Sequence, residues 1–149
     1  MTVSIREARD SDFFPWLSLY EEYASERGVE LTERRALQLW TWLSDPHHPE
    51  TSLIALGEDG GVTGLVHFHA FPRPLLGETG VFIDAIHAKD DGVADELFRA
   101  VRDAATAQGA GVIRWSQVEG ETLPRALAEA GGNAESSAYI ELQTAPQPA

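Results

Sequence analysis

The sequence contains no cysteine, which excludes disulfides and thiolate metal sites. The absence of disulfides is typical of a reducing compartment, so we expect a cytoplasmic protein. The chain also lacks any run approaching the roughly 20 apolar residues that a membrane-spanning helix needs. Its N-terminus has neither the basic nor the apolar region of a signal peptide. We therefore expect no membrane partner.

Basic side chains are scarce: 11 lysines and arginines stand against 24 acidic residues, a formal net charge of −13. A surface of this charge repels a phosphate backbone, which argues against nucleic acid as a partner. It attracts cationic small molecules such as polyamines or aminoglycosides, although the same charge also serves simply to keep a protein soluble. The chain of 149 residues, 43% of them hydrophobic, suffices for one domain with a core.

Hydrophobic periodicity predicts a single domain over residues 1–142. Strands are predicted at residues 3–7, 52–56, 62–70, 80–88, 111–116 and 137–142. Helices are predicted after Asp10 or Ser11, after Thr32, after the turn at residues 89–94 and after Pro124. Residues 71–77 form a proline-bearing loop, and residues 143–149 form a tail that we expect to be disordered. The order of elements is β-α-α-β-β-β-α-β-α-β.

The second predicted helix has one apolar face. This face consists of Ala36, Leu37, Trp40 and Leu43, and we expect it to pack on the core. The helix ends before Asp45-Pro46, because the residue before a proline is restricted away from helical angles.

The stretch from Gly80 to Ala110 joins a buried strand to the central helix through a tight turn. Such a turn leaves backbone N–H groups free at the positive end of a helix dipole, where a phosphate can bind. The alternative is an ordinary helix capped by an aspartate.

The order of elements and four stretches resemble the GNAT superfamily of acyl-CoA-dependent N-acetyltransferases, and within it the diamine and polyamine acetyltransferases. The stretches are Ile5–Asp12, the hairpin strands Ile54–Leu56 and Gly64–Phe68, the turn Lys89–Ala94 and the late helix Arg125–Gly131. The resemblance covers residues 3–142. It implies an α/β (α+β) fold: a mixed sheet of six to seven strands with helices on both faces.

The resemblance also implies a reaction, in which acetyl-CoA is the cofactor and its acetyl group is transferred directly to a small amine. It assigns cofactor binding to the end of the central strand and the turn after it: Ile86, His87, Ala88, Lys89, Gly92, Val93 and Ala94. Relatives in this superfamily often dimerise, so a homodimer is one state that the resemblance implies.

Three features depart from the family pattern. Lys89 stands where glutamine or arginine is usual, and Asp90 and Asp91 occupy positions that are often basic or glycine. A carboxylate about 5 Å from a phosphate costs about 3 kcal/mol at an effective dielectric of roughly 20, and either aspartate can cap the helix in the phosphate's place. Leu127 stands where many members have a catalytic tyrosine. We interpret the turn as a degenerate pyrophosphate loop that holds acetyl-CoA weakly.

His67 and Asp84 are the predicted catalytic residues. His67 and His69 are two apart on one strand and share a face, and we expect His67 to lie nearly opposite Asp84 on the next strand. A carboxylate that orients an imidazole makes a reasonable general base near neutral pH. The alternative is that these groups are only the polar side of a solvated sheet. Tyr139 is a candidate substitute acid, with packing as its alternative role.

The same strands offer a possible set of metal ligands: His67, His69, Asp84 and His87. Strict alternation places Asp84 and His87 on opposite faces of their strand, so no metal site is predicted.

Two hypotheses about function remain. The first is an acetyl-CoA-dependent N-acetyltransferase of small amines, supported by the strand pattern and the polar face around His67. The second is a non-catalytic GNAT-like binding or interaction module that has lost productive cofactor binding, supported by the aspartate pair and by Leu127.

Overall fold

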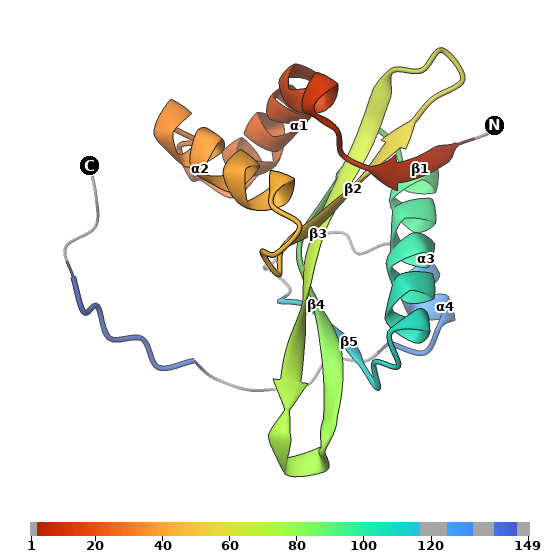
Figure 1. Cartoon of the computed structure of the whole chain (residues 1–149). Coiled ribbons are helices and arrows are strands. Elements are labelled where there is room, and N and C mark those ends of the chain that lie inside the picture. The colour runs from red at the N-terminus through yellow and green to blue at the C-terminus, as the bar shows by residue number, and fades with distance from the viewer. Residues whose placement is uncertain (1–2, 117–124, 133–138, 146–149) are drawn as a thin grey trace.

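The computed structural model describes residues 3–116, 125–132 and 139–145. Its sheet has five strands in the order β1-β2-β3-β4-β5, covered on both faces by helices (Figure 1). The strands are β1 (Ser4–Glu7), β2 (Thr51–Leu56), β3 (Val62–Arg73), β4 (Glu78–Ala88) and β5 (Ile113–Arg114). The helices are α1 (Phe13–Glu26), α2 (Glu33–Ser44), α3 (Asp91–Ala107) and α4 (Arg125–Glu129), with 3₁₀ turns η1 (Asp10–Asp12) and η2 (Pro74–Leu76).

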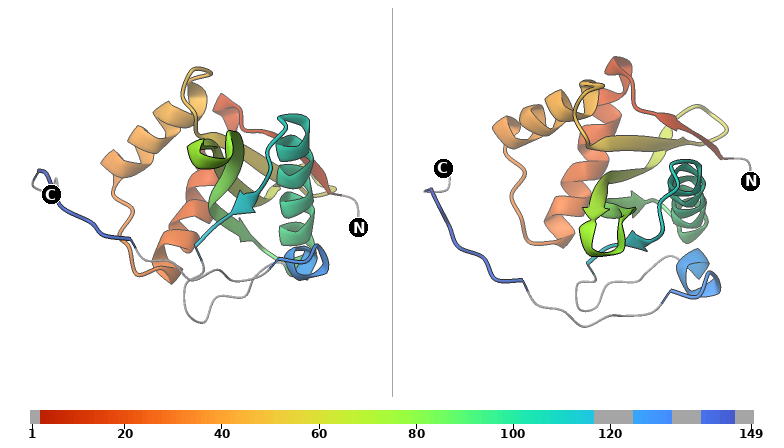
Figure 2. Two further views of the ribbon diagram at one scale, coloured as in Figure 1. Left: turned by 90° about the horizontal axis from the view of Figure 1, so that it is seen from below. Right: turned by 60° about the horizontal axis from the view of Figure 1, so that its bottom comes forward.

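The sheet is mixed, as expected. The pairs β1–β2, β2–β3 and β3–β4 are antiparallel, whereas β5 runs parallel to β4. Helices α1 and α2 cover one face, and α3 and α4 cover the other (Figure 2). The α+β class is therefore confirmed, but the described part of the chain contains five strands and not the predicted six to seven.

The difference arises partly at the C-terminal end. The predicted strand over residues 137–142 is wrong for its described part, because residues 139–142 have no regular secondary structure. The side chains of Tyr139, Ile140 and Leu142 are exposed, and Figures 1 and 2 show this segment away from the sheet. Residues 137–138 and 146–149 lie outside the described residues, so the predicted disordered tail stays a prediction. Alternating apolar residues form a stable strand only where a neighbouring strand pairs with them.

The boundaries of α2 agree with the capping residues of the sequence, whereas α1 starts at Phe13, after the 3₁₀ turn Asp10–Asp12, and the predicted cap at Asp10 or Ser11 is wrong. The Thr32 hydroxyl accepts a hydrogen bond from the Arg35 amide at 3.2 Å, and α2 ends at Ser44 as predicted. Gly28, which follows α1, adopts a left-handed φ of 69°, a conformation that glycine reaches without steric cost. The expected apolar face of α2 is narrower than predicted, because the side chain of Leu37 is exposed while that of Ala36 is buried.

The sheet separates two cores. One lies between the sheet and α3, where Leu97, Phe98 and Val101 are buried against Val66 and Val81. The other lies under α1, where Trp16 and Leu19 pack on Ile54 and Leu65.

Gly64 on β3 brings α3 close to the sheet. A Cβ atom at this position would lie 2.9 Å from side-chain carbons of Leu97 and of Val93. A side chain here would push the start of α3 away from the strands that precede it.

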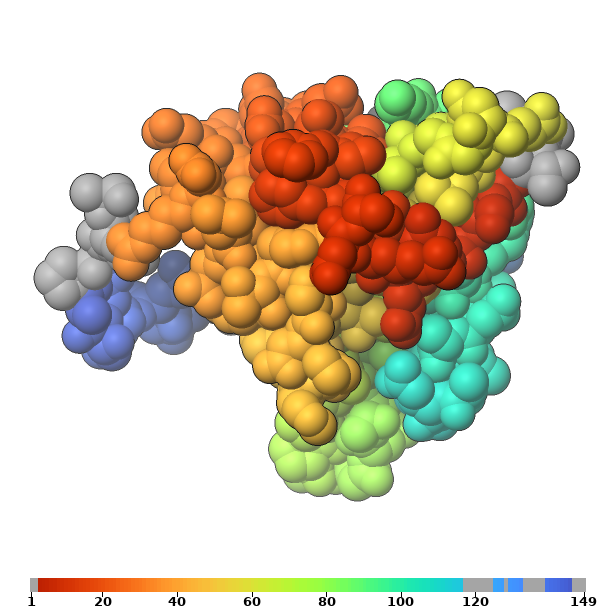
Figure 3. Space-filling model, turned by 45° about the horizontal axis from the view of Figure 1, so that its top comes forward, coloured from red at the N-terminus to blue at the C-terminus, as the bar shows by residue number. Residues whose placement is uncertain are grey.

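Strands β3 and β4 form a long ribbon that projects beyond the rest of the sheet (Figures 1 and 3). The predicted loop over residues 71–77 is shorter than expected, because Phe71, Pro72 and Arg73 continue β3 and pair with residues 78–80. Proline is tolerated in a strand where its missing N–H does not interrupt the ladder. Within the described ranges no helix is both long and apolar enough to cross a membrane.

Candidate active site

Strand β4 contains a β-bulge at Asp84. His67 of β3 pairs with Ala85, and the next residue, Phe68, pairs with Ile83, so Asp84 is an extra residue in the register. An extra residue shifts the alternation of the side chains that follow it, and bulges are frequent beside active sites.

The bulge places Asp84 and His87 on the same side of the sheet. His87 Nε2 lies 3.0 Å from Glu22 Oε2 on α1, and the charge of Asp84 acts on the hydroxyl of Tyr20, also on α1. The expectation that strict alternation sends the two residues to opposite faces is therefore wrong. A pattern of alternating apolar and polar residues cannot predict this bulge, because the local sequence carries no signal for it.

Beyond the bulge, β4 and β5 separate. They pair only at Val81–Ile113 and Phe82–Arg114, while β4 continues to Ala88. A cavity of about 150 Å³ lies at this separation. Its lining comes from α1, β4 and the end of β5: Tyr23, Arg27, Phe82, Ile83, Asp84, Ala85, Ile86, Trp115 and Ser116. We call this cavity the β4–β5 opening.

Asp84 belongs both to the β4–β5 opening and to a polar cluster of three side chains. His69 Nδ1 lies 2.6 Å from Asp84 Oδ2 and 3.7 Å from Glu50 Oε1. The three residues come from β3, from the bulge of β4 and from the connection between α2 and β2. The short contact between His69 and Asp84 is typical of a charge-assisted hydrogen bond.

Glu50 is the most buried member of the Glu50–His69–Asp84 cluster. Its side chain is 16% exposed, against 34% for His69 and 33% for Asp84, and its Oε1 has no hydrogen-bond partner. Burial, followed by the hydrogen bond with and the charge of Asp84, raises the pKa of Glu50 to about 8. The direction of this shift has a simple cause, because two adjacent carboxylates resist being ionised together.

His67, the predicted general base, is buried behind this cluster and makes no hydrogen bond to Asp84 among the described residues. Its side chain is 2% exposed, and its Nε2 accepts a hydrogen bond from Trp16 Nε1 at 3.0 Å. Burial lowers the pKa of His67 to about 4, although the charge of Asp84 acts in the opposite direction. The shared face of His67 and His69 is confirmed, but the carboxylate of Asp84 contacts His69 and not His67. The expectation of an imidazole near neutral pKa at His67 is wrong.

The residues predicted to bind the cofactor separate into two groups. Ile86 lines the β4–β5 opening, whereas His87 turns towards Glu22 and Ala88 packs against the core under α3. His87 Nδ1 also lies 3.8 Å from Glu26 Oε2.

The second group lies at the start of α3, where Asp90 caps the helix. Its Oδ1 accepts a hydrogen bond from the Val93 amide at 2.9 Å, and its carbonyl oxygen accepts one from the Ala94 amide at 3.2 Å. The side chains of Lys89 and Asp91 are exposed, as is Gly92. The Val93 amide, one of those assigned to the pyrophosphate, is thus bound by the Asp90 carboxylate, as the alternative of an aspartate cap predicted.

Tyr139, the candidate proton donor to the leaving thiolate, is not placed at the site, and Leu127 leaves the position of the family's tyrosine without a proton donor. Leu127 on α4 packs on the core of the α3 side and is apolar. The side chain of Tyr139 is 75% exposed on the segment away from the sheet.

Sequence reasoning missed Glu50. It follows His47, His48 and Pro49 in a connection without periodic pattern, so its burial depends on how α2 returns the chain to β2. The Glu50 amide donates to His48 Nδ1 at 3.1 Å, which orients the connection. The available signal was a carboxylate two residues before a predicted strand.

A divalent cation could in principle occupy the cluster. The ligand atoms of Glu50, His69 and Asp84 lie within 4.8 Å of one another. This set differs from the predicted quartet, since it excludes His67 and His87. His69 and Asp84 contact each other directly, without an ion between them, and the absence of a metal stays our prediction.

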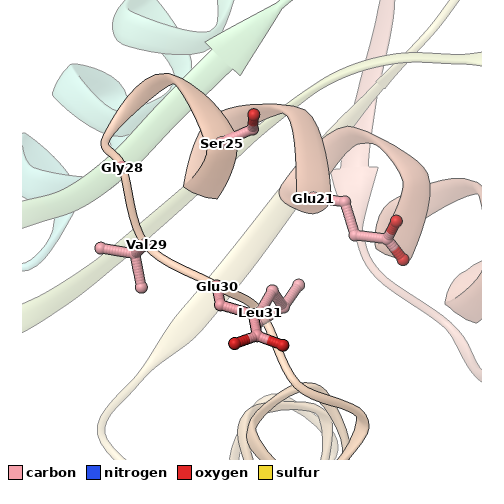
Figure 4. A pocket seen from close by; sticks show the side chains of 6 residues that line it. All are labelled: Glu21, Ser25, Gly28, Val29, Glu30 and Leu31. Atoms are coloured by element: carbon pink, nitrogen blue, oxygen red, sulfur yellow. The ribbon is translucent and has the colours of Figure 1, made fainter.

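A larger hollow, of about 410 Å³, lies elsewhere, at the end of α1. Figure 4 shows Glu21 and Ser25 on the helix and Val29, Glu30 and Leu31 on the chain that follows. It shares no lining residue with the β4–β5 opening. We place the chemistry at the smaller cavity, because Asp84 lines it and contacts the imidazole of His69.

Comparison with known proteins identifies the fold. No family model matches the sequence, and no curated protein matches it significantly. The structure is similar to ribosomal-protein-alanine N-acetyltransferase from Brucella melitensis biovar Abortus 2308, with a TM-score of 0.74 and 21% identity over 96% of this chain and 100% of that one. The chain has the GNAT acetyltransferase fold.

Two further structures support this identification. A GNAT family acetyltransferase of Staphylococcus aureus has a TM-score of 0.73 and 14% identity, over 96% of this chain and 100% of that one. AAC(6')-Iy, in complex with the bisubstrate analogue CoA-S-monomethyl-acetylneamine, has a TM-score of 0.73 and 18% identity, over 97% of this chain and 99% of that one. At these identities the likeness extends to the fold and not to the substrate.

Proposed function

We propose that the protein is an acetyl-CoA-dependent N-acetyltransferase that acts on a small cationic amine, such as a diamine or polyamine. The observation that carries this proposal is the bulge at Asp84, which brings a carboxylate in contact with an imidazole to the edge of the β4–β5 opening. Fold likeness alone does not separate an enzyme from a binding module. A proton-accepting pair beside a cavity is what amine acetylation requires.

The amine side of the opening is acidic. Asp84 lies at the bulge, with Glu50 close to it. Glu22 and Glu26 contact His87, which lies three residues after Asp84 on β4. A net charge of −13 adds a long-range attraction for cations. These features support an ammonium as the acceptor group, and a polyamine suits them because Asp84 lines the opening while Glu50, Glu22 and Glu26 lie near it.

The cofactor side fits acetyl-CoA only in part. The edge of β4 that faces away from β3 continues past its pairing with β5, and Ile86 lines the opening there, as an extended pantetheine arm would require. At the helix start, Asp90 occupies the Val93 amide that a pyrophosphate would use. Lys89 is the remaining cation of the turn. We infer a degenerate pyrophosphate loop and weak cofactor binding.

The cap made by Asp90 also supports a second candidate function, a non-catalytic module that keeps the GNAT fold without productive cofactor binding. In that case the carboxylates of the bulge would serve only to bind a cationic partner. The two functions differ in one observable, the release of free CoA in the presence of an amine.

The test is an assay of thiol release from acetyl-CoA with a panel of acceptors: putrescine, spermidine, neamine and a peptide with an N-terminal alanine. We expect amine-dependent release above the rate of thioester hydrolysis, with the diamine or polyamine preferred. If no acceptor accelerates thiol release at millimolar acetyl-CoA, the enzymatic function is wrong and the binding module is favoured.

A further inference from the structure

The connection between α2 and β2 contributes a residue that the reaction described so far does not use. Glu50 is buried beside Asp84 but does not line the β4–β5 opening. Asp84 does line it. An acceptor in the opening therefore meets Asp84, with Glu50 behind it.

The surroundings of Glu50 leave its charge only partly balanced. Its Oε1 is buried without a hydrogen-bond partner, and the imidazole nitrogen His69 Nδ1, 3.7 Å away, already contacts Asp84 at 2.6 Å. A buried carboxylate in this position is costly unless it carries a proton or faces a cation.

We propose that Glu50 and Asp84 act as one proton-sharing pair, in which Asp84 takes the proton of the acceptor ammonium and Glu50, whose ligand oxygen lies within 4.8 Å of that of Asp84, is the positioning residue that makes Asp84 able to do so. The inference rests on the proposed function, because it assigns a role within that reaction. The elevated pKa of Glu50 supports it from the electrostatic side.

The acceptor nitrogen loses two protons during the reaction. The ammonium gives one proton to the pair, so that the nitrogen lone pair is free to attack the thioester carbonyl. The N–C bond forms, the C–S bond breaks, and the second proton of the nitrogen ends on the departing CoA thiolate. The pair returns its proton to solvent before the next turnover. The sum is amide, CoA thiol and one released proton.

Titratable groups on α1, on β3 and on the connection between α2 and β2 face the Glu50–Asp84 pair. They are Tyr20 on α1, His67 and His69 on β3 and His48 on the connection itself. The pKa of Tyr20 is raised to about 12 and that of His67 is lowered to about 4, so neither of these two changes charge between pH 6.5 and 9.

The direction in which kcat changes with pH follows from the ionisation of Glu50. The pair accepts a proton only after it has released the one it holds, so kcat should rise with pH and level off above the pKa of Glu50, which is about 8. In Glu50→Gln the amide keeps the volume of the side chain but cannot share a proton. This variant should lose the rise near pH 8 and lower the limiting kcat by about 10²-fold.

The experiment measures kcat against pH at saturating acceptor for the wild type, Glu50→Gln and the control Glu58→Gln, which lies in the turn between β2 and β3. Ionisation of the acceptor is common to all three proteins and cancels in the comparison. Glu58→Gln should reproduce the wild-type profile. A Glu50→Gln profile that keeps the rise near pH 8 would overturn the pair, whatever the loss of rate.

A second readout does not need catalysis. Difference infrared spectroscopy should detect the C=O stretch of a protonated carboxyl at pH 7 that disappears through about pH 8 and is missing in Glu50→Gln. If this band is present while no acceptor is acetylated, the pair exists and the proposed function is wrong. If the wild type is active but the band is absent, the proposed function stands and the proton-sharing pair is wrong.

Discussion

The acceptor side and the cofactor side of β4 both carry aspartates, but their surroundings differ. Asp84 contacts His69 and lies beside the buried Glu50, at the edge of a cavity. Asp90 is exposed and uses its carboxylate to cap α3. The first arrangement prepares a site for a cation, whereas the second fills a site that an anion would use. The acidic side chains therefore favour the binding of a cationic amine at the first site and disfavour the binding of pyrophosphate at the second. This combination is expected of an acetyltransferase that binds its cofactor weakly.

The largest expected effect concerns Asp84. Asp84→Asn keeps the shape of the side chain but removes the proton acceptor, so acetyl transfer should fall by about 10² to 10⁴-fold. His69→Gln should lower the rate less, since the imidazole orients the carboxylate and does not line the opening. The two losses should be non-additive. Initial rates of thiol release measure this, and equal rates for Asp84→Asn and wild type would remove Asp84 from the mechanism.

The next effect sharpens the contrast between His69 and its buried neighbour His67. Because the pKa of His67 is lowered to about 4, the unfolded chain binds this proton more readily than the folded one. The stability that neutral His67 contributes is present above about pH 6.5 and is lost as the pH falls towards 4, by on the order of 3 kcal/mol.

His67→Gln isolates this contribution, because Glu50, whose raised pKa acts in the opposite direction, is present in both proteins. Urea denaturation at pH 7 and pH 4.5 should show a smaller acid loss in His67→Gln than in the wild type. A variant that loses as much stability on acidification would show that His67 is not held neutral by burial.

A smaller effect is expected on the cofactor side. Asp90→Asn removes the charge but keeps a good capping side chain, so the affinity for CoA should rise several-fold, most clearly at low salt, with little change in melting temperature. Asp91→Asn is the matched control, because Asp91 is exposed and Asp90, not Asp91, caps α3. Calorimetric titration with CoA checks both, and equal affinities for wild type and Asp90→Asn would mean that the cofactor avoids this turn.

The smallest expected effect is that of a chelator. Because we assign a proton and not a metal to the Glu50–His69–Asp84 cluster, EDTA should change neither the melting temperature nor the rate of transfer. A loss of either that added zinc restores would assign the cluster to a metal and overturn the proton-sharing pair.

These comparisons also show what the sequence could predict. Caps and glycine stops predict the helices well, because Thr32, Asp90 and Gly28 act through local backbone geometry. The bulge at Asp84 is invisible to a period-two pattern, and it changes which side chains meet. Glu50 lies in a connection, where burial depends on the packing of distant elements. The fold was therefore largely predictable, whereas the site depended on the two features without a local signal.

The most direct test of the account is calorimetric titration of the unmodified protein with acetyl-CoA, in the absence and the presence of spermidine. We predict binding in the micromolar to sub-millimolar range, a higher melting temperature at saturating cofactor by mass action, and heat of turnover when spermidine is added. No binding and no stabilisation at millimolar acetyl-CoA would contradict the acetyltransferase, and would leave a GNAT fold whose carboxylates serve another ligand.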